Sequence, residues 1–155
     1  MKTNVKLLAQ ICEVAGAPGH EQRVREIVLK NIDGIADQIE QDNLGNIYAI
    51  KKGKDSSKRV MIAAHMDEIG FMVKHIDNNG FLRFHTLGGF DAKTLTAQRV
   101  IVHGKKDLIG VMGSKPIHIM TPEERNKPVQ IHDFFIDLGL PHAEVIKQVS
   151  IGDVV

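Results

Sequence analysis

The sequence predicts an α/β region over residues 1–70, followed by a β-rich region over residues 71–155. Two segments near the start carry apolar residues at helical spacing. A nearly continuous apolar run at residues 59–64 has the length of a strand buried on both faces of a sheet. Beyond Gly70 the pattern changes to paired segments that flank turn residues, which is typical of β-hairpins.

Two amphipathic helices are expected at the start of the α/β region. The first covers about residues 5–15 and can end at Gly16. The second covers about residues 24–32 and closes near Gly34. Because Cys12 falls on the apolar face of the first helix, we expect its thiol to be a small buried hydrophobe rather than a nucleophile.

Strands are expected after the second helix. Residues 39–42 and 46–51 flank Asn43-Leu44-Gly45, which is typical of a turn between two strands. A polar loop over residues 52–58 then leads into the apolar run at 59–64. This run is expected to be a central strand of the α/β sheet.

The β-rich region begins with two hairpins. Residues 71–76 and 81–86 flank Asp77-Asn78-Asn79-Gly80, a strong hairpin signal. If Asn78 and Asn79 alone form the turn, His75 and His85 face opposite sides of the hairpin and cannot hold one ion, whereas a three-residue turn would reverse this.

Shorter elements complete the β-rich region. Residues 97–102 and 108–112 form a second hairpin candidate. Thr121-Pro122-Glu123-Glu124 has the pattern of a capping box with proline at the first helical position. The last expected elements are a strand at 134–138, a short helix at 141–149 and the start of a strand at 151–155.

Composition excludes several classes of partner. The formal net charge is +1, and aromatic residues make up 5% without a basic stripe, so no nucleic-acid partner is expected. No apolar run is long enough to span a bilayer, and the start lacks the apolar core of a signal peptide, so no membrane partner is expected. The single cysteine favours a reducing compartment, and the cytoplasm is therefore the expected location.

The sharpest chemical feature is His65-Met66-Asp67-Glu68, directly after the apolar run. Open α/β sheets place ligands and catalytic groups at the carboxyl ends of their strands. In an extended segment, residues two apart point the same way, so His65 and Asp67 would share a side. His65 could then offer a ring nitrogen to a metal, and Asp67 could orient the ring or a bound water. A structural, hydrogen-bonded histidine is the competing interpretation.

Other catalytic signatures are missing from the sequence. It contains no phosphate-binding Gly-x-x-x-x-Gly-Lys-Ser/Thr loop, no Gly-x-Ser-x-Gly nucleophile elbow and no Cys-x-x-Cys pair.

At residues 61–73 (MIAAHMDEIGFMV) the chain resembles the tetrahedral aminopeptidase and glutamyl aminopeptidase family of two-metal peptidases. The resemblance continues in order along nearly the whole chain, which makes it more specific than any single motif. The further matching segments are 17–21, 42–46, 79–83, 88–91, 97–99, 110–118, 135–139 and 151–153.

The resemblance implies an α/β metallopeptidase catalytic domain, of which residues 1–70 are the N-terminal part. Residues 71–155 would be a β-rich insertion domain, a barrel or PDZ-like, that mediates subunit contacts and returns toward the catalytic domain at its end. It also implies two divalent ions, zinc or cobalt, and dimers that assemble into a hollow dodecamer which trims peptide substrates from the N-terminus.

On the matching positions, the resemblance makes His65 a metal ligand and Asp67 the catalytic acidic residue that orients it. The remaining ligands and the general base lie further along in the family. We therefore expect this chain to be an incomplete, N-terminal portion of such an enzyme, without activity of its own.

The sequence leaves two other functions open. The first is a non-catalytic, β-rich assembly or binding module, in which His65 is structural. The second is a related two-metal hydrolase, such as a carboxypeptidase or deacylase, although the match through the β-rich region argues against it.

Overall fold

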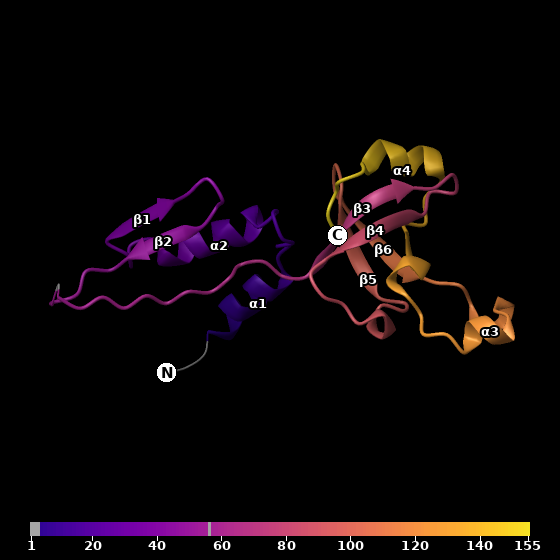
Figure 1. The fold of residues 1–155 in the computed structure, drawn as a ribbon. Coiled ribbons are helices and arrows are strands. Elements are labelled where there is room, and N and C mark those ends of the chain that lie inside the picture. Colours follow the sequence, from indigo (N-terminus) through magenta and orange to yellow (C-terminus); the bar gives the residue numbers. More distant parts are fainter. Residues whose placement is uncertain (1–3, 56) are drawn as a thin grey trace. The chain divides into compact units, whose positions relative to one another are not determined.

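The computed structural model describes residues 4–55 and 57–155 (Figure 1). The chain divides into two compact units, Met1–Glu68 and Ile69–Val155. The first unit combines two helices with a two-stranded sheet, and the second is built around a five-stranded sheet.

The two expected helices of the first unit are confirmed. Helix α1 spans Val5–Glu13 and α2 spans Gln22–Ile32. The side chain of Asn4 caps α1 by accepting a hydrogen bond from the backbone N–H of Leu7 at 3.1 Å. The expectation that Cys12 is buried is wrong, because α1 buries none of its residues and the thiol is exposed.

A hairpin follows the helices, as expected. Strand β1 (Gln38–Gln41) pairs antiparallel with β2 (Ile47–Ile50). The carboxylate of Asp42 accepts hydrogen bonds from across the turn between them. The hydrogen bond from the Asn46 side chain is the main cause that lowers the pKa of Asp42. Its donors are Leu44 N at 3.0 Å, Asn46 N at 2.9 Å, Asn46 Nδ2 at 2.7 Å and Tyr48 Oη at 3.1 Å.

The predicted strand at residues 59–64 is not formed. Val60, Met61 and Ile62 are 90%, 88% and 93% exposed, and the run does not pair as a strand. An extended segment becomes a strand only when neighbours take up its N–H and C=O groups. Among the described residues of the first unit, the paired strands are β1 and β2, and neither pairs with this run.

The sheet of the second unit is antiparallel throughout and has the order β3-β4-β7-β6-β5. Both expected hairpins and the expected short strand near residue 136 are present. The strands are β3 (Gly70–Ile76), β4 (Leu82–Leu87), β5 (Arg99–His103), β6 (Asp107–Gly113) and β7 (Phe135–Asp137).

The last residues close this sheet into a barrel. Val154 forms bridges to Met72 on β3 and to His103 on β5, the two outer strands of the sheet. Phe71 and Val155 exchange both backbone hydrogen bonds at 2.9 Å, and His103 N donates to Val154 O at 2.9 Å. The segment expected to begin a strand therefore forms only isolated bridges, and these link the two outer strands of the sheet to each other.

The barrel interior holds one continuous apolar core. The rings of Phe71 and Phe84 meet edge to face with centroids 4.7 Å apart, and Phe90 stacks on Phe71 at 4.3 Å. The fully buried side chains are Phe134, Leu82, Met112, Ile136, Val73, Val102, Val145 and Val149.

A three-residue turn sets the faces of the first hairpin. Ile76 pairs with Leu82 and Asp77 N donates to Phe81 O at 3.0 Å, so residues 78–80 form the turn and His75 pairs with Arg83. Since paired residues point to the same side, His75 and His85 lie on one face of the hairpin. Of the two turns that the sequence left open, the three-residue turn that puts both histidines on one face is therefore the one formed, and the irregularity between Val73 and His75 affects only the residues before it.

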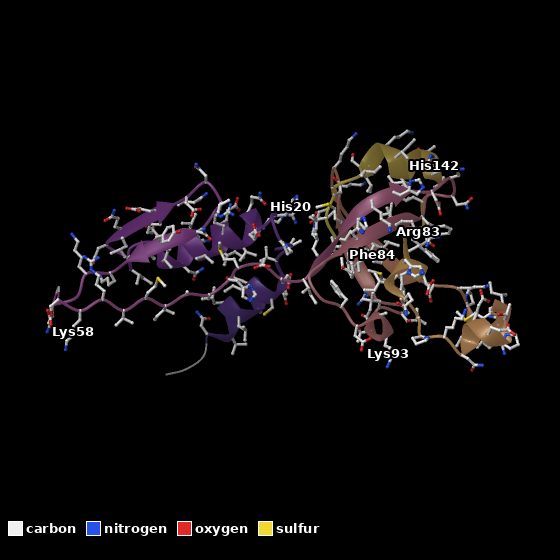
Figure 2. The ribbon with its side chains drawn as sticks, viewed as in Figure 1. His20, Lys58, Arg83, Phe84, Lys93 and His142 are labelled. Carbon is white, nitrogen blue, oxygen red and sulfur yellow. The ribbon has the colours of Figure 1, made fainter. Side chains whose placement is uncertain are left out.

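Short helices connect and cover the barrel. Helix α3 (Pro122–Arg125) begins with the expected capping box of Thr121 and Glu124. Helix α4 (His142–Gln148) buries Val145, and His142, labelled in Figure 2, donates from Nδ1 to the carbonyl oxygen of Asp77 at 2.8 Å. In the part of the chain that the structure describes, no helix is long and apolar enough to cross a bilayer.

Candidate functional site

His65 and Asp67 lie side by side in the first unit. The His65 Nδ1 atom is 3.1 Å from the Asp67 carboxylate Oδ1 and 2.8 Å from the Asp67 carbonyl oxygen. The imidazole side chain is 82% exposed and that of Asp67 is 38% exposed. The shared side expected for the two residues is therefore what the structure shows, while their roles as ligand and orienting residue stay predictions.

The contacts of Nδ1 decide which ring nitrogen of His65 is available. A carbonyl oxygen can only accept a hydrogen bond, so Nδ1 carries the hydrogen. In the neutral ring, Nε2 then has the free lone pair, which is the form that binds metal ions. The Asp67 carboxylate also accepts from Nδ1, an arrangement that orients the ring.

A backbone hydrogen bond anchors the His65–Asp67 segment to the rest of the first unit. The backbone N–H of Glu68 donates to the carbonyl oxygen of Gly16 at 2.8 Å. Gly16 also lies against Val24, because a Cβ at this position would come within 2.6 Å of Val24 Cγ2. Sequence reasoning assigned Gly16 only the role of ending a helix and missed this contact.

The residues present do not complete a catalytic metal site. A catalytic zinc site has three protein ligands and an open position. Among the described residues, no group of three or more histidine, cysteine or acidic side chains could hold an ion together. The chain therefore offers one imidazole nitrogen with its carboxylate partner, and no reaction step can be derived from these residues alone.

The other histidines have separate surroundings. His103 Nδ1 lies 2.8 Å from Asp107 Oδ1 in the β5–β6 hairpin. His132 Nε2 lies 3.5 Å from Asp133 Oδ1. His20 Nδ1 is 3.5 Å from the carbonyl oxygen of Pro18, and Figure 2 labels this side chain. None of these contacts involves His65 or Asp67.

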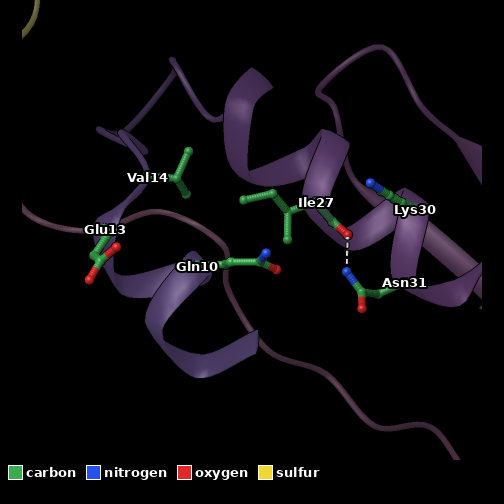
Figure 3. A pocket seen from close by; sticks show the side chains of 6 residues that line it. All are labelled: Gln10, Glu13, Val14, Ile27, Lys30 and Asn31. Atoms are coloured by element: carbon green, nitrogen blue, oxygen red, sulfur yellow. Dashed lines mark hydrogen bonds between the residues drawn. The ribbon is translucent and has the colours of Figure 1, made fainter. Parts of the chain in front are cut away.

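An open groove of about 590 Å³ lies between α1 and α2 (Figure 3). Val14 and Ile27 supply its apolar part, and the other lining side chains are polar or charged. The Asn31 side chain on its rim donates to the carbonyl oxygen of Ile27 at 2.8 Å. The groove does not include His65 or Asp67, so it is separate from the candidate site.

The known proteins that this chain resembles include aminopeptidases. The chain is 37% identical over 154 residues to the putative aminopeptidase FrvX of Escherichia coli, with 97% of the chain and 43% of the relative covered. It resembles the solved TET aminopeptidase of a marine sediment Thaumarchaeota archaeon with a TM-score of 0.91 and 38% identity, covering 97% of this chain and 43% of that one.

A second solved structure extends this likeness. The Pyrococcus horikoshii TET1 peptidase, which can assemble into a tetrahedron or a large octahedral shell, matches with a TM-score of 0.83 and 31% identity. The match covers 98% of this chain and 46% of that one. The chain thus spans less than half the length of the relatives named here.

The fold and the sequence point to the same family. The α/β fold of the chain is similar to that of the TET aminopeptidases. The family model for M42 glutamyl aminopeptidases matches residues 45–155, which include His65, Asp67 and the whole barrel. This chain therefore belongs to the M42 glutamyl aminopeptidase family.

Proposed function

We propose that this chain belongs to a metal-dependent aminopeptidase, in which His65 ligates one of two divalent ions and Asp67 orients the His65 ring. The observation that carries the proposal is the contact of His65 Nδ1 with the Asp67 carbonyl and carboxylate oxygens at 2.8 and 3.1 Å. It leaves Nε2 as the coordinating atom. The family match and the dependence of this family on metal ions support the same assignment.

The two units would have different tasks in such an enzyme. Residues 1–70 would belong to the catalytic domain and residues 71–155 would form the β-rich insertion domain. When bound, a pair of zinc or cobalt ions would supply an activated water and polarise the scissile carbonyl. The contribution of this chain is limited to holding one ligand in its metal-binding tautomer and orientation.

The substrates and the assembly belong to the same proposal. The substrates would be peptides with a free N-terminal amine, cleaved one residue at a time. The protein would form dimers that build a larger shell such as a dodecamer, and the tetrahedron and octahedral shell of the P. horikoshii TET1 peptidase support this part. The single cysteine is in keeping with a cytoplasmic location.

Metal content of the intact protein tests the assignment of His65 and Asp67. We expect His65→Ala to lose bound zinc or cobalt, and Asp67→Asn to weaken metal binding about 10–100-fold, because outer-shell partners contribute on that scale. His75→Ala is the matched control, since His75 is exposed on the barrel. Unchanged metal content in His65→Ala, measured by mass spectrometry after dialysis, would rule out the ligand role.

The substrate class is tested with paired peptides. The intact, metal-loaded protein should release the first residue from peptides with a free N-terminus and should leave the same peptides intact when the amine is acetylated. Equal cleavage of both forms would exclude an aminopeptidase. Cleavage only at the C-terminus would favour a related two-metal carboxypeptidase instead.

A specific observation also favours a second candidate, a non-catalytic assembly module. The second unit has a closed sheet and its own core, as expected of an independent module. In that case the intact protein would bind no metal and release no amino acids, while it still associated with itself.

A further inference from the structure

The imidazole of His65 takes its orientation from Asp67. Its Nδ1 atom bonds to the carbonyl and carboxylate oxygens of Asp67 at 2.8 and 3.1 Å. The rest of the His65 side chain is open to solvent, with 82% of its surface exposed, so packing does not hold the ring. The direction of its free nitrogen therefore depends on where the backbone of Asp67 lies.

Gly16 contacts the residues on both sides of Asp67. Its carbonyl oxygen accepts a hydrogen bond from the backbone N–H of Glu68 at 2.8 Å. A Cβ on Gly16 would lie 3.6 Å from the carbonyl oxygen of Met66, which is an ordinary van der Waals distance. The backbone of Asp67 is therefore held between two neighbours that both meet Gly16.

Gly16 in turn lies tightly against Val24 in the first turn of α2. A Cβ on Gly16 would come within 2.6 Å of Val24 Cγ2. Carbon atoms pack at about 3.5–4.0 Å, so one of the two residues would have to move. Val24 is only 3% exposed and has no open space to turn into. Gly16 is not among the glycines with a positive φ, so this contact, and not the backbone conformation, is what requires a glycine.

The buried residues of the first unit gather around this contact. Within residues 4–55 and 57–68 they are Gly16, Ala17, Val24 and Gly45. Arg25, which follows Val24, donates from Nε to the carbonyl oxygen of Gly45 at 2.9 Å, and its guanidinium lies 3.8 Å from the Glu21 carboxylate. Close packing and these polar contacts give the loop that carries Gly16 a firm base on α2.

We propose that Gly16 is a positioning residue for His65, because its packing against Val24 fixes the Asp67 backbone and thereby the direction of His65 Nε2. Gly16 binds no metal itself and acts only through Asp67. A binding group keeps its full affinity only when the residues behind it hold it within about 0.5 Å of its working position. The inference rests on the proposed role of His65 as a ligand, but the position of the Asp67 backbone can be followed without metal.

Substitutions in the intact protein separate positioning from stability. Gly16→Ala should raise the dissociation constant for cobalt about 10–100-fold, because the new methyl group pushes the loop away from α2 and moves the support behind a ligand. Val24→Ala loses a buried side chain and should lower the melting temperature, yet leave cobalt affinity nearly unchanged. The double variant should recover most of the affinity, since Val24 Cγ2 is the atom in the way.

Gly53→Ala is the matched control, because a Cβ on Gly53 would meet only the carbonyl oxygen of Asp55, at 4.0 Å. It should leave cobalt affinity and melting temperature unchanged.

Two further measurements report on geometry. The visible absorption of bound cobalt depends on the arrangement of its ligands, so Gly16→Ala should change the spectrum and the double variant should restore it. In the metal-free protein, hydrogen exchange at the Glu68 amide should speed up in Gly16→Ala and slow again in the double variant, because the bond to Gly16 O is weakened and then remade.

Unchanged cobalt affinity in Gly16→Ala, with unchanged exchange at Glu68, would overturn the inference. A double variant that binds cobalt as weakly as Gly16→Ala would do the same. So would a loss of affinity in Val24→Ala that matches its loss of stability, because affinity would then report only how well the protein folds.

A wild-type protein that binds no cobalt would instead refute the proposed role of His65. The exchange of the Glu68 amide in the metal-free variants then decides the positioning role alone. Faster exchange in Gly16→Ala that the double variant reverses supports it, and unchanged exchange contradicts it.

Discussion

The two units of the chain differ in how many of their apolar side chains they bury. Among the described residues, the first unit buries two apolar side chains, Ala17 and Val24, whereas the second buries twelve around a closed barrel. The first unit nevertheless contains the most continuous apolar run of the chain, at residues 59–64. Burial therefore follows the closure of a sheet by its partner strands more than the hydrophobicity of a segment.

Truncating an apolar side chain should reveal the largest difference between the units, in the free energy of unfolding. Leu82→Ala in the barrel should lower the free energy of unfolding by about 2–5 kcal/mol, because Leu82 is fully buried and its loss leaves a cavity. Met61→Ala should change it by less than about 0.5 kcal/mol, since Met61 is 88% exposed. Urea denaturation measures both, and equal effects would mean that the exposed run is packed in solution.

Closure of the barrel can be broken more selectively. Val155→Pro removes the N–H that donates to Phe71 O at 2.9 Å and should lower the free energy of unfolding by about 1–3 kcal/mol. Hydrogen exchange should then speed up at the amides of Phe71 and Val73. Val60→Pro, in the unpaired run, should leave these amides protected. Unchanged exchange in Val155→Pro would show that the barrel does not need this segment.

The smallest change in stability should come from protonation of Asp42 in the β1–β2 turn. Hydrogen bonds, chiefly from the Asn46 side chain, lower the pKa of Asp42 below its ordinary value of 3.8. A lowered pKa in the folded state contributes stability above the unfolded value, and this stability is lost as the pH falls through the lowered pKa.

The amide chemical shifts of Leu44 and Asn46 should therefore change below about pH 4. The Asp42→Asn variant should show no such transition. A transition centred above pH 4 would contradict the direction of the pKa shift.

Local structure was largely predictable from the sequence. Both helices, the hairpins around Asp42 and Asp77 and the capping box of Thr121 formed where the pattern placed them. These elements depend on contacts between residues a few positions apart, such as the Asp77 carboxylate accepting from the N–H groups of Asn79 and Phe81. Register was less predictable, because the sequence did not decide between a two-residue and a three-residue turn, and the three-residue turn formed puts His75 on the face of His85.

The contact between His65 and Asp67 was predictable from the sequence, but the setting of the two residues was not. The alternation of an extended segment correctly placed His65 beside Asp67. The same reasoning set them at the end of a buried strand, and the preceding residues are instead exposed and unpaired. The anchor from Glu68 to Gly16 joins residues far apart in the chain, and no local pattern predicts such a contact.

By itself, the sequence determined the helices and turns, the adjacency of His65 and Asp67, and the resemblance to a peptidase family that comparison then confirmed. Only the tertiary structure decided that Val154 closes the barrel and that the run at 59–64 stays exposed. The physical reason is the distance along the chain between the residues that interact. Turns and caps are satisfied by neighbours in the chain, whereas a strand needs distant segments to take up its hydrogen bonds and cover its apolar side chains.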